Sequence, residues 1–134
     1  ILRRGRMPAD GLAFVAFDDN QMIGTVRLWH VNAGNAGSAL LLGPLAVEKE
    51  YSGAGVGAGL MYVALNAAQS AGHRAVLLVG DPQYYARFGF HADPASGLMM
   101  PGHFDRHRFL GINLGEDVLG GTSGTLIASG QPLH

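Results

Sequence analysis

Cysteine is absent from the 134-residue sequence, which excludes disulfides, thiolate metal sites and a cysteine nucleophile. Charge is also scarce: 14% of the residues are charged, and 9 basic residues stand against 10 acidic ones. Because no basic excess is present to neutralise phosphates, we expect no nucleic-acid partner. The lack of cysteine fits a cytoplasmic protein.

No apolar run approaches the roughly 18 residues that a membrane span needs, so we expect no membrane partner. The basic start, residues 1–6, lacks the apolar stretch and the small-residue cleavage site of a signal peptide. Apolar residues, in contrast, make up 48% of the sequence. This content suffices for one packed core, and the length is short for two domains, so we predict a single domain over residues 1–134.

Hydrophobic patterning predicts a hairpin followed by a long apolar strand. Residues 12–17 and 22–31 are predicted to form two antiparallel strands joined by a polar turn. The apolar run 39–47 is typical of a strand buried on both faces. Gly43 and Pro44 lie inside this run, and because proline cannot donate to a ladder, we expect the strand to kink or lose a neighbour there.

A strand–helix–strand unit is predicted around the next segments. Apolar residues recur at helical spacing from residue 60 until Gly72, which suits a helix end. Residues 75–79 are predicted to form a second buried strand, and Pro82 suits the start of a short helix. Residues 109–114 are predicted to form a late strand. The unit implies a parallel pair, and the hairpin makes the sheet of this α/β (α+β) fold mixed.

Four glycines alternate at positions 53, 55, 57 and 59, between the predicted strand and the predicted helix. A glycine-rich segment that opens a helix leaves backbone N–H groups unpaired, and the helix dipole adds partial positive charge there. Phosphate is the natural ligand of such a turn. A flexible helix entry that binds nothing is the alternative, and it suits one glycine better than four.

Two well-known phosphate motifs compete for this turn. A P-loop ends in Gly-Lys-Ser/Thr, whereas Gly57 is followed by Ala58 and another glycine, so that candidate fails. Residues 53–58 do match the dinucleotide pattern G-x-G-x-x-A, with Asp81 near the place of a ribose-binding acid. However, the strand ends well before the first glycine, and repeated strand–helix units do not follow. A dinucleotide-binding domain is therefore the weaker alternative.

Two segments resemble motifs of the GNAT acyltransferase superfamily. Residues 42–47 with the glycine turn are similar to its acetyl-coenzyme A motif, Gln/Arg-x-x-Gly-x-Gly/Ala. Residues 80–90, Gly-Asp-Pro-Gln-Tyr-Tyr-Ala-Arg-Phe-Gly-Phe, resemble its aromatic-rich helix that ends in Gly-Phe. The resemblance covers about residues 12–92 and is greatest for uncharacterised bacterial N-acetyltransferases. It implies the acyl-CoA N-acyltransferase fold: a mixed, mostly antiparallel central sheet with a splayed parallel pair and flanking helices.

The resemblance also implies the cofactor-binding residues. Gly55 and Gly57 match the two motif glycines, and the turn amides are expected to hold the diphosphate of acetyl-coenzyme A (acetyl-CoA). Pantetheine is expected to pair with the splayed strand as an added strand would. Ser52 replaces the family's Gln or Arg, and Ala54 a frequent Arg, so backbone donors are expected to dominate. The complete set is Leu45, Ala46, Val47, Ser52, Gly53, Ala54, Gly55, Val56, Gly57 and Ala58.

The implied reaction is direct attack of a neutral primary amine, from an unidentified acceptor, on the thioester of the co-substrate acetyl-CoA. It needs a base, an oxyanion donor and an acid. Tyr85 matches the family tyrosine that protonates the departing thiolate, although packing alone would also explain Tyr84 and Tyr85. Glu48 is a candidate base acting through water, and a main-chain N–H near Leu45 or Val47 is a candidate oxyanion donor.

His103 and His107, with Asp105 between them, offer no third strong ligand, so we predict no metal site. The family places a strand and two helices before the first hairpin, and only residues 1–6 stand there, so we expect the N-terminal part to be missing. An acyl-CoA-binding regulatory module without turnover is the alternative function, and a homodimer is left open.

Overall fold

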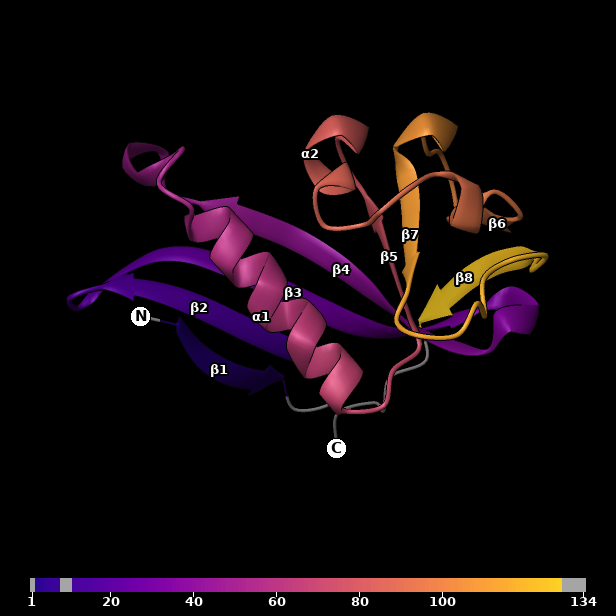
Figure 1. Ribbon diagram of the computed structural model, residues 1–134, viewed down its shortest axis with the longest axis horizontal. Helices are drawn as coiled ribbons and strands as arrows, with labels where there is room; N and C mark the ends of the chain where they lie inside the picture. Colours follow the sequence, from indigo (N-terminus) through magenta and orange to yellow (C-terminus); the bar gives the residue numbers. More distant parts are fainter. Residues whose placement is uncertain (1, 8–10, 129–134) are drawn as a thin grey trace.

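The computed structural model describes residues 2–7 and 11–128, with side chains over 12–128. Within these residues an eight-stranded mixed sheet carries one long helix on one face (Figure 1). Its main path runs β1-β2-β3-β4-β5-β7, and β8 pairs with β3 and β6. The elements are β1 (Leu2–Met7), β2 (Gly11–Asp18), β3 (Gln21–Ala33), β4 (Ser38–Val47), α1 (Val56–Ser70), β5 (Ala75–Val79), α2 (Pro82–Ala86), β6 (Leu98–Met99), β7 (Phe109–Asn113) and β8 (Gly124–Ala128).

The hairpin predicted from the first apolar segments is confirmed as β2 and β3, which pair antiparallel. Alternate residues of both strands, such as Phe14, Val26 and Leu28, are buried on one face. β1 pairs antiparallel with β2, so residues 2–6 of the expected N-terminal remnant form a strand, while Ile1 lies outside the described residues. No helix in the described part of the chain is long and apolar enough to cross a bilayer.

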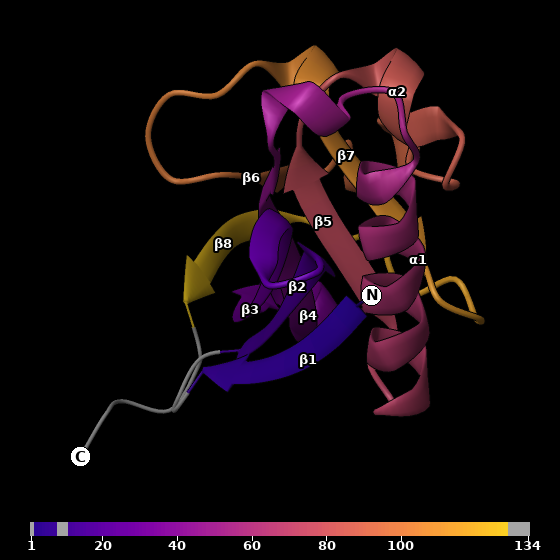
Figure 2. The same cartoon turned by 90° about the vertical axis from the view of Figure 1, so that its left-hand side faces the viewer.

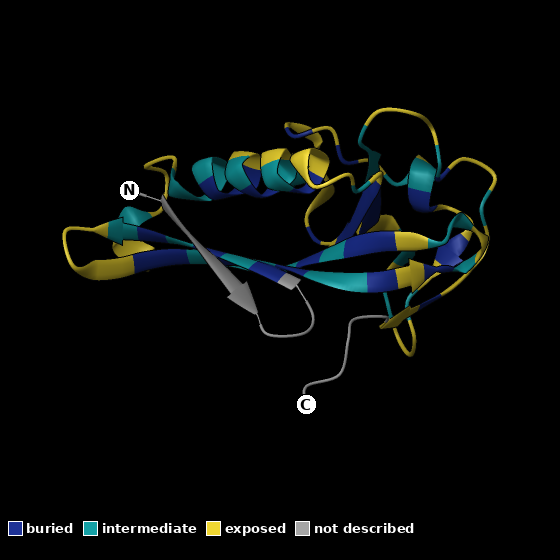
Figure 3. Cartoon of the chain, turned by 90° about the horizontal axis from the view of Figure 1, so that it is seen from below, coloured by how far each residue is buried: buried dark blue, intermediate teal, exposed yellow. Residues whose placement is uncertain are grey.

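The long helix α1 covers the sheet face formed by β2, β3 and β4. It buries Leu60, Met61, Ala64 and Ala68, which recur at the three- and four-residue spacing of one helix face. Figure 3 shows these buried positions turned toward the sheet and the exposed ones away from it. Gly72, with a φ of 88°, follows the helix end as predicted.

A second apolar cluster occupies the opposite face of the sheet. Val31, Ala39 and Leu77 from the strands pack with Leu98 and Leu126 from β6 and β8. Figure 2 shows α1 on one side of the sheet and β8 on the other. The two faces of the central strands are therefore both covered, which explains their nearly continuous apolar sequences.

β4 and β5 form a short parallel pair and then separate. The register joins Leu40 to Val76 and Leu41 to Leu77, and no later residue of β4 pairs with β5. β4 also uses three steps, from residue 42 to 45, where β3 uses two, so Gly43 and Pro44 form a bulge. The predicted kink and loss of a neighbour are confirmed.

Burial along β4 corrects one expectation from the sequence. The strand was expected to be buried on both faces throughout, but only its first half meets that description, with Ala39, Leu40 and Leu42 buried. Pro44 and Ala46 in the second half are exposed, because β5 no longer lies alongside. β5 then pairs antiparallel with β7, so the described strands lack the repeated parallel order of a dinucleotide-binding fold.

Candidate functional site

The parted strands β4 and β5 enclose a cavity of ≈ 510 Å³, called here the splay cavity. In Figure 1 the two strands fan apart, and α2 lies over the end of β5. The walls come from the second half of β4, the end of β5, α2 and the residue before β7. They are Leu42, Gly43, Pro44, Leu45, Val79, Gly80, Asp81, Tyr84, Tyr85 and Arg108.

Three consecutive residues place α2 and its tyrosines at this cavity. The Asp81 carboxylate accepts a hydrogen bond from the Gln83 amide at 3.1 Å and caps α2, and Pro82 occupies its first turn. A Cβ on Gly80 would collide with the Tyr85 ring, so glycine lets the ring lie against the end of β5. Asp81, the acid considered for a dinucleotide site, is thus engaged as a helix cap.

Tyr85 is half-buried in the wall of the splay cavity. Burial raises the pKa of its phenol above the ordinary value of 10.0, and the nearby Tyr84 and Asp81 raise it further, whereas Arg108 lowers it. The phenol is therefore protonated at neutral pH. This is the form that a general acid needs.

The glycine turn leads into α1 with its amides exposed. Gly55 is the N-cap with a φ of 85°, a backbone region that favours glycine, and no side chain caps the helix. The amides of Val56, Gly57 and Ala58 have no acceptor among the described residues. Uncapped amides at the positive end of a helix dipole are a good site for an anion.

Two amides of the predicted binding set are already engaged inside the turn. The Ser52 amide donates to the Lys49 carbonyl at 3.1 Å, and the Ala54 amide donates to the Tyr51 carbonyl at the same distance. These bonds build the turn itself. The amides free to meet a ligand are thus those of Gly53, Gly55 and the first turn of α1.

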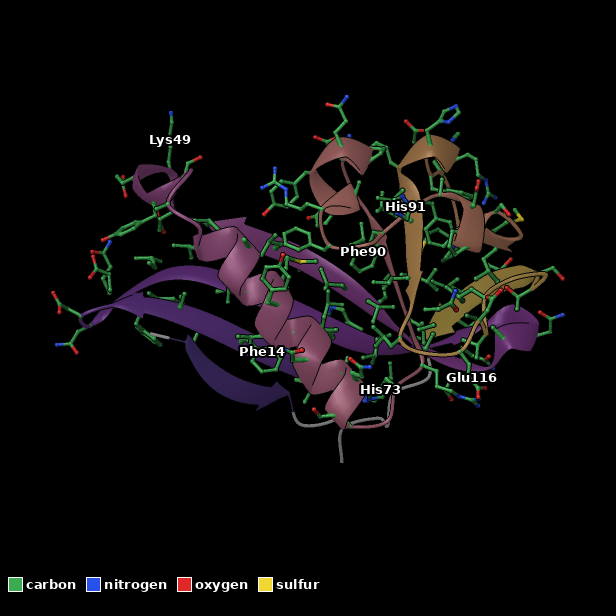
Figure 4. All side chains as sticks on the ribbon, in the orientation of Figure 1. Phe14, Lys49, His73, Phe90, His91 and Glu116 are labelled. Atoms are coloured by element: carbon green, nitrogen blue, oxygen red, sulfur yellow. The ribbon has the colours of Figure 1, made fainter. Side chains whose placement is uncertain are left out.

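A second cavity of ≈ 290 Å³ lies at this helix start and is called here the turn cavity. Tyr84 lines both cavities, so they adjoin at its ring. Near this end of α1, Figure 4 labels Lys49, which precedes the turn. The turn cavity is lined by Val47, Tyr51, Ser52, Gly53, Gly55, Val56, Gly57, Ala58, Tyr84 and Arg87.

The approach to the glycine turn is anchored to the β2–β3 hairpin. The Tyr51 hydroxyl donates a hydrogen bond to the Asp18 carboxylate. This bond, with the negative charges of Asp18, Glu50 and Asp19, raises the pKa of Tyr51. The wall of the turn cavity that contains Tyr51 therefore lies close to several negatively charged side chains.

The predicted residues of β4 divide between different surfaces. Leu45 lines the splay cavity and Val47 the turn cavity, whereas Ala46 lines a third, smaller depression together with Val47 and Glu48. The Glu48 amide donates to the Ile23 carbonyl at 2.7 Å. Glu48, the candidate base, is thus separate from the cavity that contains Tyr85.

Sequence reasoning missed two cations that the structure brings to these cavities. Arg87 lines the turn cavity, and Arg108 lines the splay cavity. Arg87 was detectable, because residues three apart on a helix share a face and Tyr84 precedes it by three. Arg108 gave no such signal, since it reaches Tyr85 only through the pairing of β7 with β5.

Several other polar residues lie outside the linings of these two cavities. The Asp105 carboxylate accepts a hydrogen bond from the His107 amide at 2.9 Å and caps a short 3-10 helix. His30 contacts His73 with 5.3 Å between ring centroids, and Figure 4 places His73 at the C-terminal end of α1. No group of three potential metal ligands occurs among the described residues.

Comparison with known proteins agrees with this geometry. The model of the acetyltransferase (GNAT) domain matches residues 9–92. The chain belongs to the GNAT acetyltransferase family. The uncharacterized N-acetyltransferase YhbS of Escherichia coli is 34% identical over 115 residues, which are 84% of this chain and 69% of YhbS. The resemblance inferred from the two motifs, and the acyltransferase class that it implied, are therefore confirmed.

Solved structures of this GNAT family show the same fold. The crystal structure of E. coli YhbS in complex with CoA has a TM-score of 0.78 and 30% identity, covering 88% of this chain and 67% of that one. A GNAT acetyltransferase from Brucella melitensis in complex with acetyl-CoA has a TM-score of 0.64 and 27% identity, covering 91% and 66%. The mixed sheet with flanking helices predicted from the sequence is thus confirmed.

Proposed function

We propose that this GNAT domain transfers the acetyl group of acetyl-CoA to a primary amine by direct attack of the amine on the thioester. One observation carries the proposal: the turn cavity and the splay cavity adjoin at Tyr84. A diphosphate joined to a long thioester arm matches this arrangement of free amides followed by an open strand edge. The CoA and acetyl-CoA bound to the two related proteins support the same ligand.

In this proposal the diphosphate binds the turn cavity. The amides of Val56, Gly57 and Ala58 donate to its oxygens, and the α1 dipole favours its charge. The arm then runs along β4 past Leu45, on the edge that β5 has left. Unpaired main-chain groups of that edge are available to the amides of pantetheine, in the manner of strand addition.

The chemical step uses Tyr85 as the acid. The amine nitrogen bonds to the thioester carbonyl carbon, a main-chain N–H near Leu45 or Val47 stabilises the oxyanion, and the carbon–sulfur bond then breaks. The amine loses a proton to a base, and Tyr85 gives its proton to the departing thiolate. The raised pKa of Tyr85 keeps that proton in place until the thiolate forms.

The identity of the base is the least supported part of this mechanism. Glu48 stays a prediction, and because it lines a depression apart from Tyr85, it requires water molecules to relay the proton. A Glu48→Gln variant tests it directly. A large fall in kcat with unchanged binding of CoA supports Glu48 as the base, whereas an unchanged kcat removes it.

The main experiment measures release of the CoA thiol from acetyl-CoA with a panel of primary amines. We expect Tyr85→Phe to lower kcat by about 10²-fold or more, since a general acid contributes on that order. Its effect on CoA affinity should be small, because the ring remains. Tyr62→Phe is the matched control, since Tyr62 is exposed on α1 and contacts only the edge of the Phe88 ring among aromatic residues.

Two outcomes would contradict the proposal in different ways. If the wild-type chain binds CoA but releases no thiol with any amine, the domain is a binding module without turnover. If Tyr85→Phe turns over like the wild type, the reaction stands but its acid is another group. A chain that does not bind CoA at all contradicts the assignment of both cavities.

A further inference from the structure

The turn cavity has one feature that the motif glycines do not explain. Among the described residues that line it, Arg87 alone carries a charge. The positions where the family pattern has Gln or Arg, and often a further Arg, hold Ser52 and Ala54 here. The motif itself therefore supplies no cation for a ligand with several negative charges.

The guanidinium of Arg87 lies on the Tyr84 ring, 4.6 Å from its centroid. The hydroxyl of Tyr84 reaches the first turn of α1, because a Cβ built on Gly57 would lie 2.9 Å from the hydroxyl oxygen. Tyr84 thus bridges the helix start and the guanidinium. The cation thus lines the same cavity as the free amides of α1, although it comes from the C-cap of α2.

Arg87 is also free to bind a ligand. Its side chain is exposed, and its guanidinium has no carboxylate partner among the described residues. The carboxylates near the cavity cluster instead around Tyr51, where Asp18, Asp19 and Glu50 act. Because these charges would repel a diphosphate, a neighbouring cation matters more here than in a neutral site.

We propose that Arg87 binds the diphosphate of CoA and supplies the positive side-chain charge of the turn cavity. This inference rests on the proposed function, since it assumes that the turn cavity holds the diphosphate. Guanidinium is well suited to phosphate oxygens, because its planar fork donates two parallel hydrogen bonds. Stacking on Tyr84 pre-orients that fork toward the cavity.

The test compares ligands with and without the diphosphate. Calorimetry with CoA should show Arg87→Met binding about 10- to 100-fold more weakly than the wild type, the loss expected for a charge-assisted contact. Dephospho-CoA, which keeps the diphosphate, should show the same loss. Acetyl-pantetheine, which lacks it, should keep its kcat/KM for thiol release. Methionine retains the apolar stem over Tyr84, and Arg74→Met is the control, because Arg74 is exposed at the far end of α1.

Rescue gives an independent readout. In the Arg87→Met background, Ser52→Arg restores a cation to the same cavity, so it should recover most of the lost CoA affinity. Thermal melts of the Arg87→Met and Arg87→Ala variants check that the loss of affinity is not a loss of folding.

Each of three other results overturns the inference. Equal losses for CoA and acetyl-pantetheine mean that Arg87 only supports Tyr84. A loss that disappears with dephospho-CoA assigns Arg87 to the 3′-phosphate instead. An unchanged CoA affinity removes Arg87 from the site. Absence of CoA binding by the wild type would instead contradict the proposed function, and so is distinguished from all three.

Discussion

The two halves of β4 have similar apolar sequences but different neighbours. Residues 38–42 lie between β3 and β5 and contribute to both cores, whereas residues 43–47 keep β3 alone and leave one edge free. The first half packs into the cores, with Leu42 also at the wall of the splay cavity, and the second half lines the splay and turn cavities. Apolar character alone therefore does not distinguish a strand segment in the core from one that lines a cavity. The presence or absence of the neighbouring strand β5 makes the difference.

The largest contrast is expected between two leucines of this strand. Leu40 is fully buried, so Leu40→Ala should lower the free energy of unfolding by about 2–5 kcal/mol. Leu45 is only partly buried, and Leu45→Ala should cost no more than about 1 kcal/mol. Chemical denaturation measures both. CoA affinity should show the reverse order among folded variants, and equal destabilisation by the two changes would break the comparison.

A matched pair of glycines separates conformational cost from ligand binding. Gly55 and Gly37 have φ values of 85° and 80°, and a Cβ on either would meet nothing within 4 Å. Alanine at each position should therefore cost about 1–2 kcal/mol of unfolding free energy, from backbone conformation alone. Only Gly55→Ala should also weaken the binding of CoA, as measured by calorimetry. Weakening by Gly37→Ala would show that the effect is not local to the turn.

The junction between the two halves depends on one side chain. The Trp29 Nε1 donates to the Gly43 carbonyl at 2.8 Å, across the bulge. Trp29→Phe keeps an aromatic ring but removes the donor, so we expect a loss of about 0.5–1.5 kcal/mol in the free energy of unfolding. Thermal melts measure it. A larger fall in CoA affinity than in stability would show that the bond also shapes the splay cavity.

The smallest expected effect is a pH dependence at the far end of α1. Burial, and secondarily the neighbouring His30, lowers the pKa of His73 below its ordinary 6.5. The folded state favours the neutral ring, so this contribution to stability is present above that value and declines as pH falls through the lowered pKa. Unfolding curves between about pH 7.5 and 5 should show a weaker decline for His73→Gln. An equally steep decline in His73→Gln and in the wild type would contradict the role of His73.

Much of the fold was predictable from local pattern. Residues 75–79 form β5 as predicted, and Gly72 marks the end of α1, because short apolar runs and glycine ends are local signals. Pro44 correctly predicted where the sheet opens. Only the expected burial of residues 43–47 on both faces was wrong, because it depends on how far β5 follows β4 and on which elements cover that end of the sheet.

The site was predictable only where it is contiguous in sequence. The glycine turn lies in one segment, so its position at the start of α1 followed from spacing, whereas its binding role stays a prediction. The positions of Arg108 and Glu48 were not predictable in this way. Arg108 reaches the splay cavity through strand pairing, and Glu48, just after β4, lines a separate depression. Residues of these kinds are assigned by three-dimensional neighbours, which a single sequence does not contain.

The extra residue at Gly43 and Pro44 also decides which face of the sheet each later side chain of β4 points to. In a regular strand, Leu42 would share its face with residues 44 and 46. The bulge instead brings Leu45 and Val47 to the face of α1, where both approach Gly57. Deleting one residue here would exchange inward and outward side chains along the whole rim, so this strand tolerates substitution far better than a change of length.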